Sequence, residues 1–122
     1  PLVDDDAIDA VIKKHDGTFI EVQIKARSKT VKMGDGALFA AIPHDVRKDY
    51  YFVFYSERLD TFWIMSSEEF VKEAVQNKTG KNVGLRSIWF NGKRKDKVTG
   101  EYTEHAHERF KKYIVTDFSK FK

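Results

Sequence analysis

The chain has 122 residues, of which 41% are hydrophobic and 14% aromatic, enough to form the core of one globular domain and to exclude a wholly disordered protein. It contains no cysteine, which excludes disulfide bonds, thiolate metal sites and cysteine nucleophiles. No apolar run approaches the roughly 18–20 residues that a membrane-spanning helix needs, so we expect a cytoplasmic protein with no membrane partner.

The net charge of +3 is unevenly distributed along the chain. Residues 1–71 carry 9 Lys and Arg against 13 Asp and Glu, whereas residues 72–122 carry 13 against 6. This asymmetry suits a protein that binds cations with one region and a polyanion with the other, although ordinary surface scatter also produces it. We therefore describe a single domain with a core, residues 1–78, and a basic C-terminal extension, residues 79–122.

Two strands are predicted at the start of the chain, over residues 7–14 and 18–27. In the second strand, apolar side chains that can enter a core alternate with a polar file formed by Glu21, Gln23 and Lys25. An acid, an amide and a lysine in one file are unusual for a plain solvent face. The file is therefore a candidate site.

The loop between these strands decides which residues lie opposite the polar file. A two-residue loop would place Asp9 opposite Ile24, among aliphatic side chains. A three-residue loop over residues 15–17, with Gly17 in the left-handed region, places Asp9 opposite Gln23 and gives both strands one apolar face. We predict the three-residue loop.

The rest of the chain mixes strand and helix patterns, which predicts an α+β (mixed α/β) fold. The helix over residues 66–78 begins with a capping box, in which Ser66 and Glu69 satisfy each other's backbone amides. In chain order the sequence predicts one or two helical turns over 37–42, a central strand over 50–56, its hairpin partner over 60–65, the helix over 66–78, a strand over 82–90, a basic loop over 91–101 and a helix over 103–114.

The predicted hairpin brings together the groups that phosphodiester hydrolysis needs. Asp9 and Gln23 offer oxygen atoms, which are the ligands that Mg²⁺ takes, and Lys25 can orient an attacking water or stabilise a charged phosphate. Asp6 lies at the mouth of the hairpin. The alternative is that this face is merely hydrated, with Glu21 and Lys25 as solvated charges.

The motifs D-A-I-D-A-V-I and G-T-F-I-E-V-Q-I-K resemble the active-site hairpin of the PD-(D/E)xK nuclease superfamily. The resemblance covers roughly residues 4–65 and implies a restriction-endonuclease-like central mixed sheet flanked by helices. It also implies that Asp9 is the first acid, Gln23 the second ligand position and Lys25 the lysine. The backbone carbonyl of Ile24 is implied as a further ligand, and the metal as Mg²⁺ or Mn²⁺.

The chain departs from this family pattern in two respects. Gln23 replaces an acid, so it brings an oxygen but no charge, although the superfamily includes branches with Gln at this position. The family fold also has a helix and a strand before the Asp-bearing strand, and here only eight residues precede Asp9. We therefore expect either a piece of a longer protein or a chain that lacks those elements. Asp6 and Glu21 are candidates for accessory roles only.

Lysines and arginines near the end of the chain could bind a nucleic-acid backbone. Trp89 and Phe90 precede the basic loop and could stack on bases, but two core residues are the favoured interpretation. His105 and His107, two apart on a predicted helix, should point to different faces and form no metal pair. The basic residues are Lys93, Arg94, Lys95 and Lys97 in the loop, with Lys111 and Lys112 beyond it.

The sequence thus favours a metal-dependent endonuclease that acts on DNA. The rival hypotheses are a catalytically inactive nuclease-fold domain that binds nucleic acid or protein, and a structural accessory domain. Besides DNA, the expected partner is a second copy of the chain or an N-terminal segment of the same protein.

Overall fold

The computed structural model describes residues 9–121. Asp6 lies outside the described residues. Within them the chain forms a mixed α+β fold that is rich in strands and poor in helix. The elements are β1 (Ala10–Lys13), β2 (Phe19–Arg27), β3 (Leu38–Ile42), β4 (Tyr50–Ser56), β5 (Thr61–Ser66), α1 (Ser67–Glu73), β6 (Val75–Gln76), β7 (Arg86–Trp89), β8 (Asn91–Lys95), β9 (Tyr102–Ala106), η1 (Glu108–Tyr113), β10 (Ile114–Val115) and η2 (Ser119–Phe121).

The largest sheet has the strand order β1-β2-β4-β5-β10 and is mixed. β2 and β4 are parallel, whereas the other neighbours in this sheet are antiparallel. A parallel pair requires a crossover connection, and residues 28–49 provide it. That crossover contains β3, which joins a second sheet of order β3-β7-β6, while β8 and β9 form a two-stranded hairpin.

The β1–β2 hairpin has the predicted three-residue turn. Lys13 pairs with Phe19, and the Lys14 N–H donates to the Thr18 carbonyl oxygen at 2.7 Å. Gly17 has a φ of 90°, in the left-handed region, as this turn requires. The prediction is therefore confirmed.

Tyr50–Ser56 forms β4, the central strand of the largest sheet, and β5 is its antiparallel partner, as predicted. The capping box is also present, because Ser66 Oγ accepts the Glu69 N–H and Glu69 accepts the Ser66 N–H. The helix is shorter than predicted. It ends at Glu73 because Ala74 is extended, and Val75 and Gln76 pair with β7 instead.

Two predictions of helix are wrong. Residues 37–42 form β3, in which Leu38 and Phe39 pair with Trp89 and Ile88 of β7. Residues 102–106 form β9, and only the 3₁₀ segment η1 follows. In both places an available strand edge outweighs the local helical pattern, as tertiary pairing often does.

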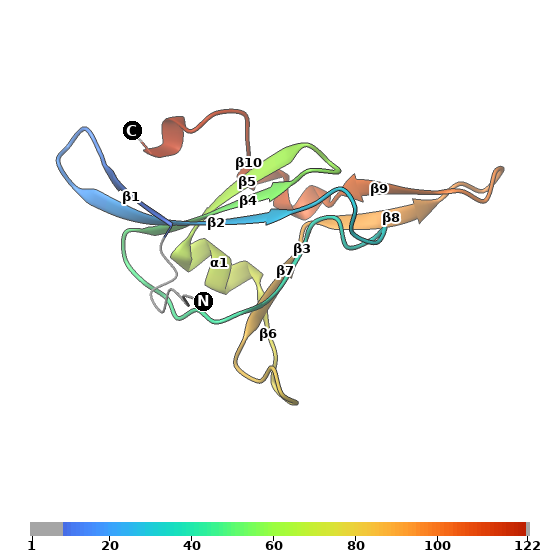
Figure 1. The fold of residues 1–122 in the computed structure, drawn as a ribbon, viewed down its shortest axis with the longest axis horizontal. Coiled ribbons are helices and arrows are strands. Elements are labelled where there is room, and N and C mark those ends of the chain that lie inside the picture. Colours follow the sequence, from blue (N-terminus) through green and yellow to red (C-terminus); the bar gives the residue numbers. More distant parts are fainter. Residues whose placement is uncertain (1–8, 122) are drawn as a thin grey trace.

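The main core lies on the face of the largest sheet that packs against α1 and the second sheet (Figure 1). It contains closely packed aromatic side chains: Phe52 stacks on Phe54, and Phe54 packs at a tilt against Phe90. The opposite face carries a smaller cluster with Ile20 and Val22, covered in part by η2 near the C-terminus. None of the described helices is long and apolar enough to cross a membrane.

Candidate active site on the first hairpin

The polar file of β2 points toward the main core. In the parallel pairing of β2 with β4, Glu21, Gln23 and Lys25 lie beside Tyr50, Phe52 and Phe54 respectively. Gln23 is 8% exposed, and Glu21 and Lys25 are half-buried. The file therefore lies at the margin of the core, where water has limited access.

Asp9 lies just before β1 and contacts β2 through both its backbone and its side chain. Its N–H donates to the Val22 carbonyl oxygen at 2.8 Å, and its Oδ2 accepts the Ile24 N–H at 2.6 Å. These two contacts lie on either side of Gln23 in β2. The strand pairing itself ends at Ala10 opposite Val22, so the placement of Asp9 opposite Gln23 stays a prediction. The N–H and C=O of one residue in a strand point to the same side, so the Ile24 carbonyl also faces Asp9.

Gln23 is fixed by a contact to the neighbouring strand. The Tyr50 hydroxyl donates to Gln23 Oε1 over 3.0 Å. An amide oxygen has two lone pairs, so this bond leaves Gln23 Oε1 able to bind one further partner. Tyr50 thereby orients the amide without blocking it.

Glu21 is paired with Arg47, a residue that sequence reasoning missed. Arg47 Nη2 lies 2.9 Å from Glu21 Oε1, and the guanidinium lies 5.0 Å from the centroid of the Tyr50 ring. The ion pair neutralises the charge of Glu21, so Glu21 supplies little charge to a metal. Its main contribution is to hold Arg47, which packs on Tyr50. No local motif predicts this contact, because Arg47 lies in the crossover, 26 residues after Glu21.

Lys25 borders a hollow between β2 and β3. The hollow has a volume of about 190 Å³. Within residues 9–121, no carboxylate forms an ion pair with Lys25. Its ammonium group is therefore available to an anion. The other residues that line the hollow are Ala26, Arg27, Leu38, Phe39, Ala40 and Ile42.

The oxygen atoms of Asp9 and of the neighbouring β2 residues fit a hard divalent cation by their chemistry. They comprise one carboxylate, the Gln23 amide oxygen and the Ile24 carbonyl, and Mg²⁺ accepts few protein oxygens while keeping several waters. The described residues contain no cluster of three or more His, Asp or Glu side chains that could hold a metal. A cation here would therefore depend on amide and carbonyl oxygens besides Asp9.

Comparison with protein-family models, curated proteins and solved structures finds no match to this chain. A functional assignment must therefore come from the geometry of the chain itself.

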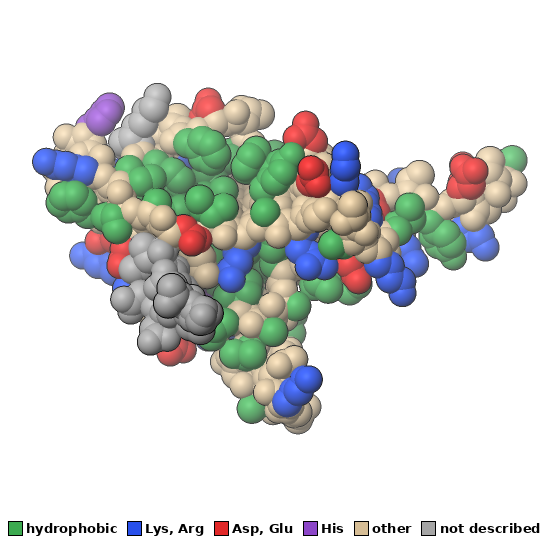
Figure 2. Space-filling model, in the orientation of Figure 1, with side chains coloured by type: hydrophobic (Ala, Val, Ile, Leu, Met, Phe, Trp, Pro, Cys, Tyr) green, Lys and Arg blue, Asp and Glu red, His purple; other side chains and the backbone are tan. Residues whose placement is uncertain are grey.

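The basic loop of the sequence is a projecting hairpin, β8–β9, with Lys and Arg side chains along it (Figures 1 and 2). Lys93 and Lys95 share a face with Tyr102, and their ammonium groups lie 4.8 Å and 5.9 Å from its ring centroid. Arg94 is on the other face of β8, and Lys97 lies in the turn.

Lys111 and Lys112 belong to η1 instead of this hairpin. Lys111 Nζ lies 4.0 Å from Glu108, and Lys112 Nζ lies 3.7 Å from Glu73. These carboxylates partly neutralise the pair. The structure thus separates the two basic groups that the sequence suggested.

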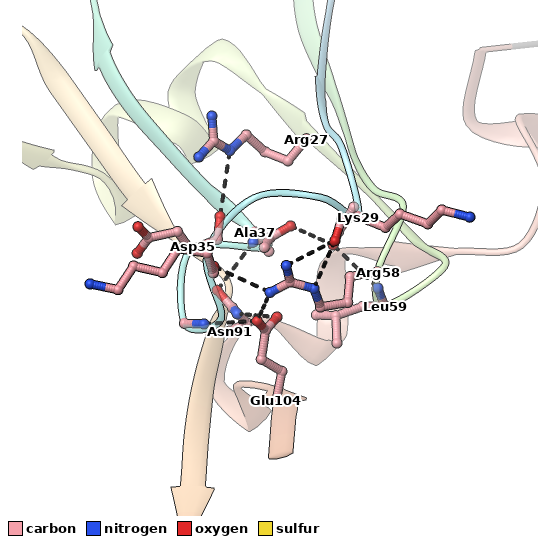
Figure 3. Close-up of polar contacts among 12 residues, drawn as sticks. Arg27, Lys29, Asp35, Ala37, Arg58, Leu59, Asn91 and Glu104 are labelled. Atoms are coloured by element: carbon pink, nitrogen blue, oxygen red, sulfur yellow. Dashed lines mark hydrogen bonds and ion pairs between the residues drawn. The ribbon is translucent and has the colours of Figure 1, made fainter. Parts of the chain in front are cut away.

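A buried carboxylate attaches the projecting hairpin to the rest of the molecule (Figure 3). The Glu104 side chain is 3% exposed and forms an ion pair with Arg58. It also accepts the Gly34 N–H at 2.7 Å and an Asn91 Nδ2–H at 2.9 Å. Gly36 lies close by, and a Cβ there would collide with the Glu104 carboxylate unless that side chain moved.

The two histidines at the end of β9 are close together, contrary to prediction. The ring centroids of His105 and His107 are 5.8 Å apart, because residue 105 lies in a strand and alternate strand residues share a face. The prediction for the neighbouring aromatics is half right. Phe90 is fully buried, whereas Trp89 is 47% exposed.

Proposed function

We propose that this chain is a metal-dependent endonuclease of the PD-(D/E)xK type that hydrolyses DNA phosphodiester bonds. The observation that carries the proposal is the 2.6 Å contact between Asp9 Oδ2 and the Ile24 N–H. It fixes a carboxylate at the backbone of Ile24, on the strand that also carries Gln23 and Lys25. Two of the proposed metal ligands and a cation for the phosphate thus belong to β2.

In this proposal Asp9, Gln23 and the Ile24 carbonyl hold Mg²⁺ or Mn²⁺. When bound, the cation lowers the pKa of a water molecule and polarises the phosphate. Lys25 donates a hydrogen bond from Nζ to a phosphate oxygen and stabilises the charge that develops there. Tyr50 keeps the Gln23 oxygen in place, and Arg47, paired with Glu21, packs over the Tyr50 ring, so both have positioning roles.

The proposal is tested by a cleavage assay on linear, circular and branched DNA with Mg²⁺ and with Mn²⁺. The variant Lys25→Ala should cut about 100-fold more slowly, which is the typical cost of removing one group that stabilises transition-state charge. Lys29→Ala is the matched control, because Lys29 is an exposed lysine just after β2. It should cut at the wild-type rate.

Two results would contradict the proposal. One is the absence of cleavage by the wild-type protein with either metal on every DNA form. The other is cleavage by Lys25→Ala at the rate of Lys29→Ala.

The projecting β8–β9 hairpin favours a second candidate, a non-catalytic nucleic-acid-binding domain. In that case DNA binding survives Lys25→Ala but depends on Lys93, Arg94 and Lys95. Neutralising these three to Gln should reduce the slope of log K against log salt by about 0.9 for each phosphate that the protein no longer binds. Neutralising Lys78 and Lys81, exposed in the loop between β6 and β7, should leave the slope unchanged.

A further inference from the structure

Trp89 is an exposed aromatic residue between two buried apolar residues. Ile88 and Phe90 enter the core, whereas Trp89, the last residue of β7, is 47% exposed. The only other tryptophan of the chain, Trp63, is fully buried and stacks on Phe90 with a centroid distance of 4.5 Å. Trp89 therefore adds nothing to that aromatic stack and is available to a ligand.

Two hollows meet at Trp89. One has a volume of about 340 Å³ and the other about 300 Å³, and both are bordered by Trp89 and His107. These volumes lie at the lower end of the range found for small-molecule sites, about 300–1,000 Å³. A flat ring could thus lie against the indole in the larger hollow, where Met33 adds apolar surface.

The edges of these hollows carry cations. Lys32 and Lys93 border the larger hollow, and Arg109 borders the smaller one. Two carboxylates are also present, Asp35 and Glu73. Glu73 is already engaged, because it accepts the Tyr113 hydroxyl at 2.7 Å and lies 3.4 Å from Arg109 and 3.7 Å from Lys112. The larger hollow is thus an aromatic surface with two lysines and one carboxylate, Asp35, beside it.

Trp89 lies one strand away from the hollow beside Lys25. Leu38 of β3 pairs with Trp89 of β7 and also lines that hollow. The larger hollow beside Trp89 further includes Lys93 of the projecting hairpin. A DNA strand that runs from the hairpin toward Lys25 would therefore pass over Trp89.

We infer that Trp89 and the larger hollow bind an unpaired nucleotide of a DNA strand, with its base stacked on the indole and its phosphate near Lys32 and Lys93. Stacking on an aromatic side chain needs a base that is free of its partner strand, because bases in a duplex are already stacked. The inference rests on the proposed function. It specifies the substrate as single-stranded or branched DNA instead of continuous duplex.

The test is a binding measurement without divalent metal, so that cleavage cannot occur. In a Trp63→Phe protein, Trp89 is the single remaining tryptophan. An oligothymidine strand should quench its fluorescence. Trp89→Ala should weaken binding of this strand about tenfold, the loss expected for one base–aromatic stack. Trp89→Phe, which keeps an aromatic face, should recover most of the affinity, and binding of a blunt duplex should change little.

Two results would overturn the inference. One is unchanged emission of Trp89 at saturating oligothymidine. The other is equal binding of the single strand by Trp89→Ala and the wild-type protein. Because no metal is present, a protein that fails to cut DNA but shows the Trp89-dependent binding refutes the nuclease proposal alone. A protein that cuts DNA, with Trp89→Ala binding normally, refutes this inference alone.

Discussion

Gln23 is a buried amide whose oxygen is held by a hydroxyl from the adjacent strand. A buried polar group without a partner is costly, so the Tyr50 hydroxyl both stabilises the fold and sets the direction of the amide. The identity of residue 23 therefore matters to folding as well as to the proposed metal site.

Tyr50→Phe should reduce the free energy of unfolding by about 1–2 kcal/mol, because it removes the donor from a buried acceptor. Urea denaturation measures this change. Tyr51→Phe is the matched control, since Tyr51 lies on the other face of the same strand against Phe121. It should be nearly neutral, and an equal loss in both variants would show that the Gln23 contact contributes nothing.

His44 is held in its neutral form. Burial lowers the pKa of His44 below its ordinary value of 6.5, and the charges of Arg47 and Arg86 lower it further. Its ring packs against Tyr50 and its Nε2 lies 2.7 Å from Ser67 Oγ. Protonation of His44 therefore opposes folding.

The unfolded chain binds this proton more readily than the folded one, so the contribution of His44 to stability is complete above pH 6.5. It is lost as the pH falls from there toward the lower folded pKa. The free energy of unfolding, measured in urea at about pH 7.5 and about pH 5.5, should therefore fall less in His44→Asn than in the wild type. His15→Asn, in the exposed turn of the first hairpin, should keep the wild-type dependence, and an equal fall in all three proteins would contradict this assignment.

At the residue scale, alternation alone predicted that Asp9 lies across from Gln23. Only one loop length keeps the aliphatic side chains of both strands on one face, which is a local argument. Arg47 and Tyr50 could not be predicted as partners of the polar file. Their contacts depend on β2 and β4 lying side by side, and that pairing is set by a crossover of more than twenty residues.

At the element scale, the hairpin β8–β9 shows where sequence patterns mislead. Residues 103–114 have apolar residues at helical spacing, yet Thr103 and Glu104 pair with Arg94 and Lys93. The buried Glu104–Arg58 ion pair accounts for this outcome. Glu104 connects β9 to the turn between β4 and β5 through Arg58, to the crossover through Gly34 and to β8 through Asn91. No local pattern predicts these contacts.

Glu104→Ala should lower the free energy of unfolding by about 3 kcal/mol, because it leaves Arg58 without its buried partner. Glu101→Ala is the matched control in the same hairpin, where the side chain is exposed, and should stay within about 0.5 kcal/mol of the wild type. Chemical denaturation measures both. If the two variants lose equal stability, the hairpin is not held through Glu104.

At the scale of the whole molecule, the sequence predicted a mixed sheet and its central strand but not the second sheet. β4 is apolar on both faces, which indicated a central position between two packed layers. The second sheet forms because β3 and β7, 44 or more residues apart, pair with each other. Such long-range pairing leaves little trace in local periodicity.

Three features lie on neighbouring elements: the Asp9 contact with β2, the hollow beside Lys25, and Trp89 before the projecting hairpin. The largest sheet carries the first, β3 separates the second from the third, and the hairpin extends beyond them (Figure 1). We propose that a divalent cation binds at the first of these features, beside Asp9.

Paramagnetic broadening by Mn²⁺ in the amide spectrum of the ¹⁵N-labelled protein tests that claim most directly. At low Mn²⁺, the signals of Gln23, Ile24 and their neighbours in the first hairpin should broaden first. Asp9→Asn, which keeps an oxygen for the Ile24 N–H but removes the charge, should abolish this effect. Broadening centred on His105 and His107, or spread evenly over the spectrum, would contradict the account.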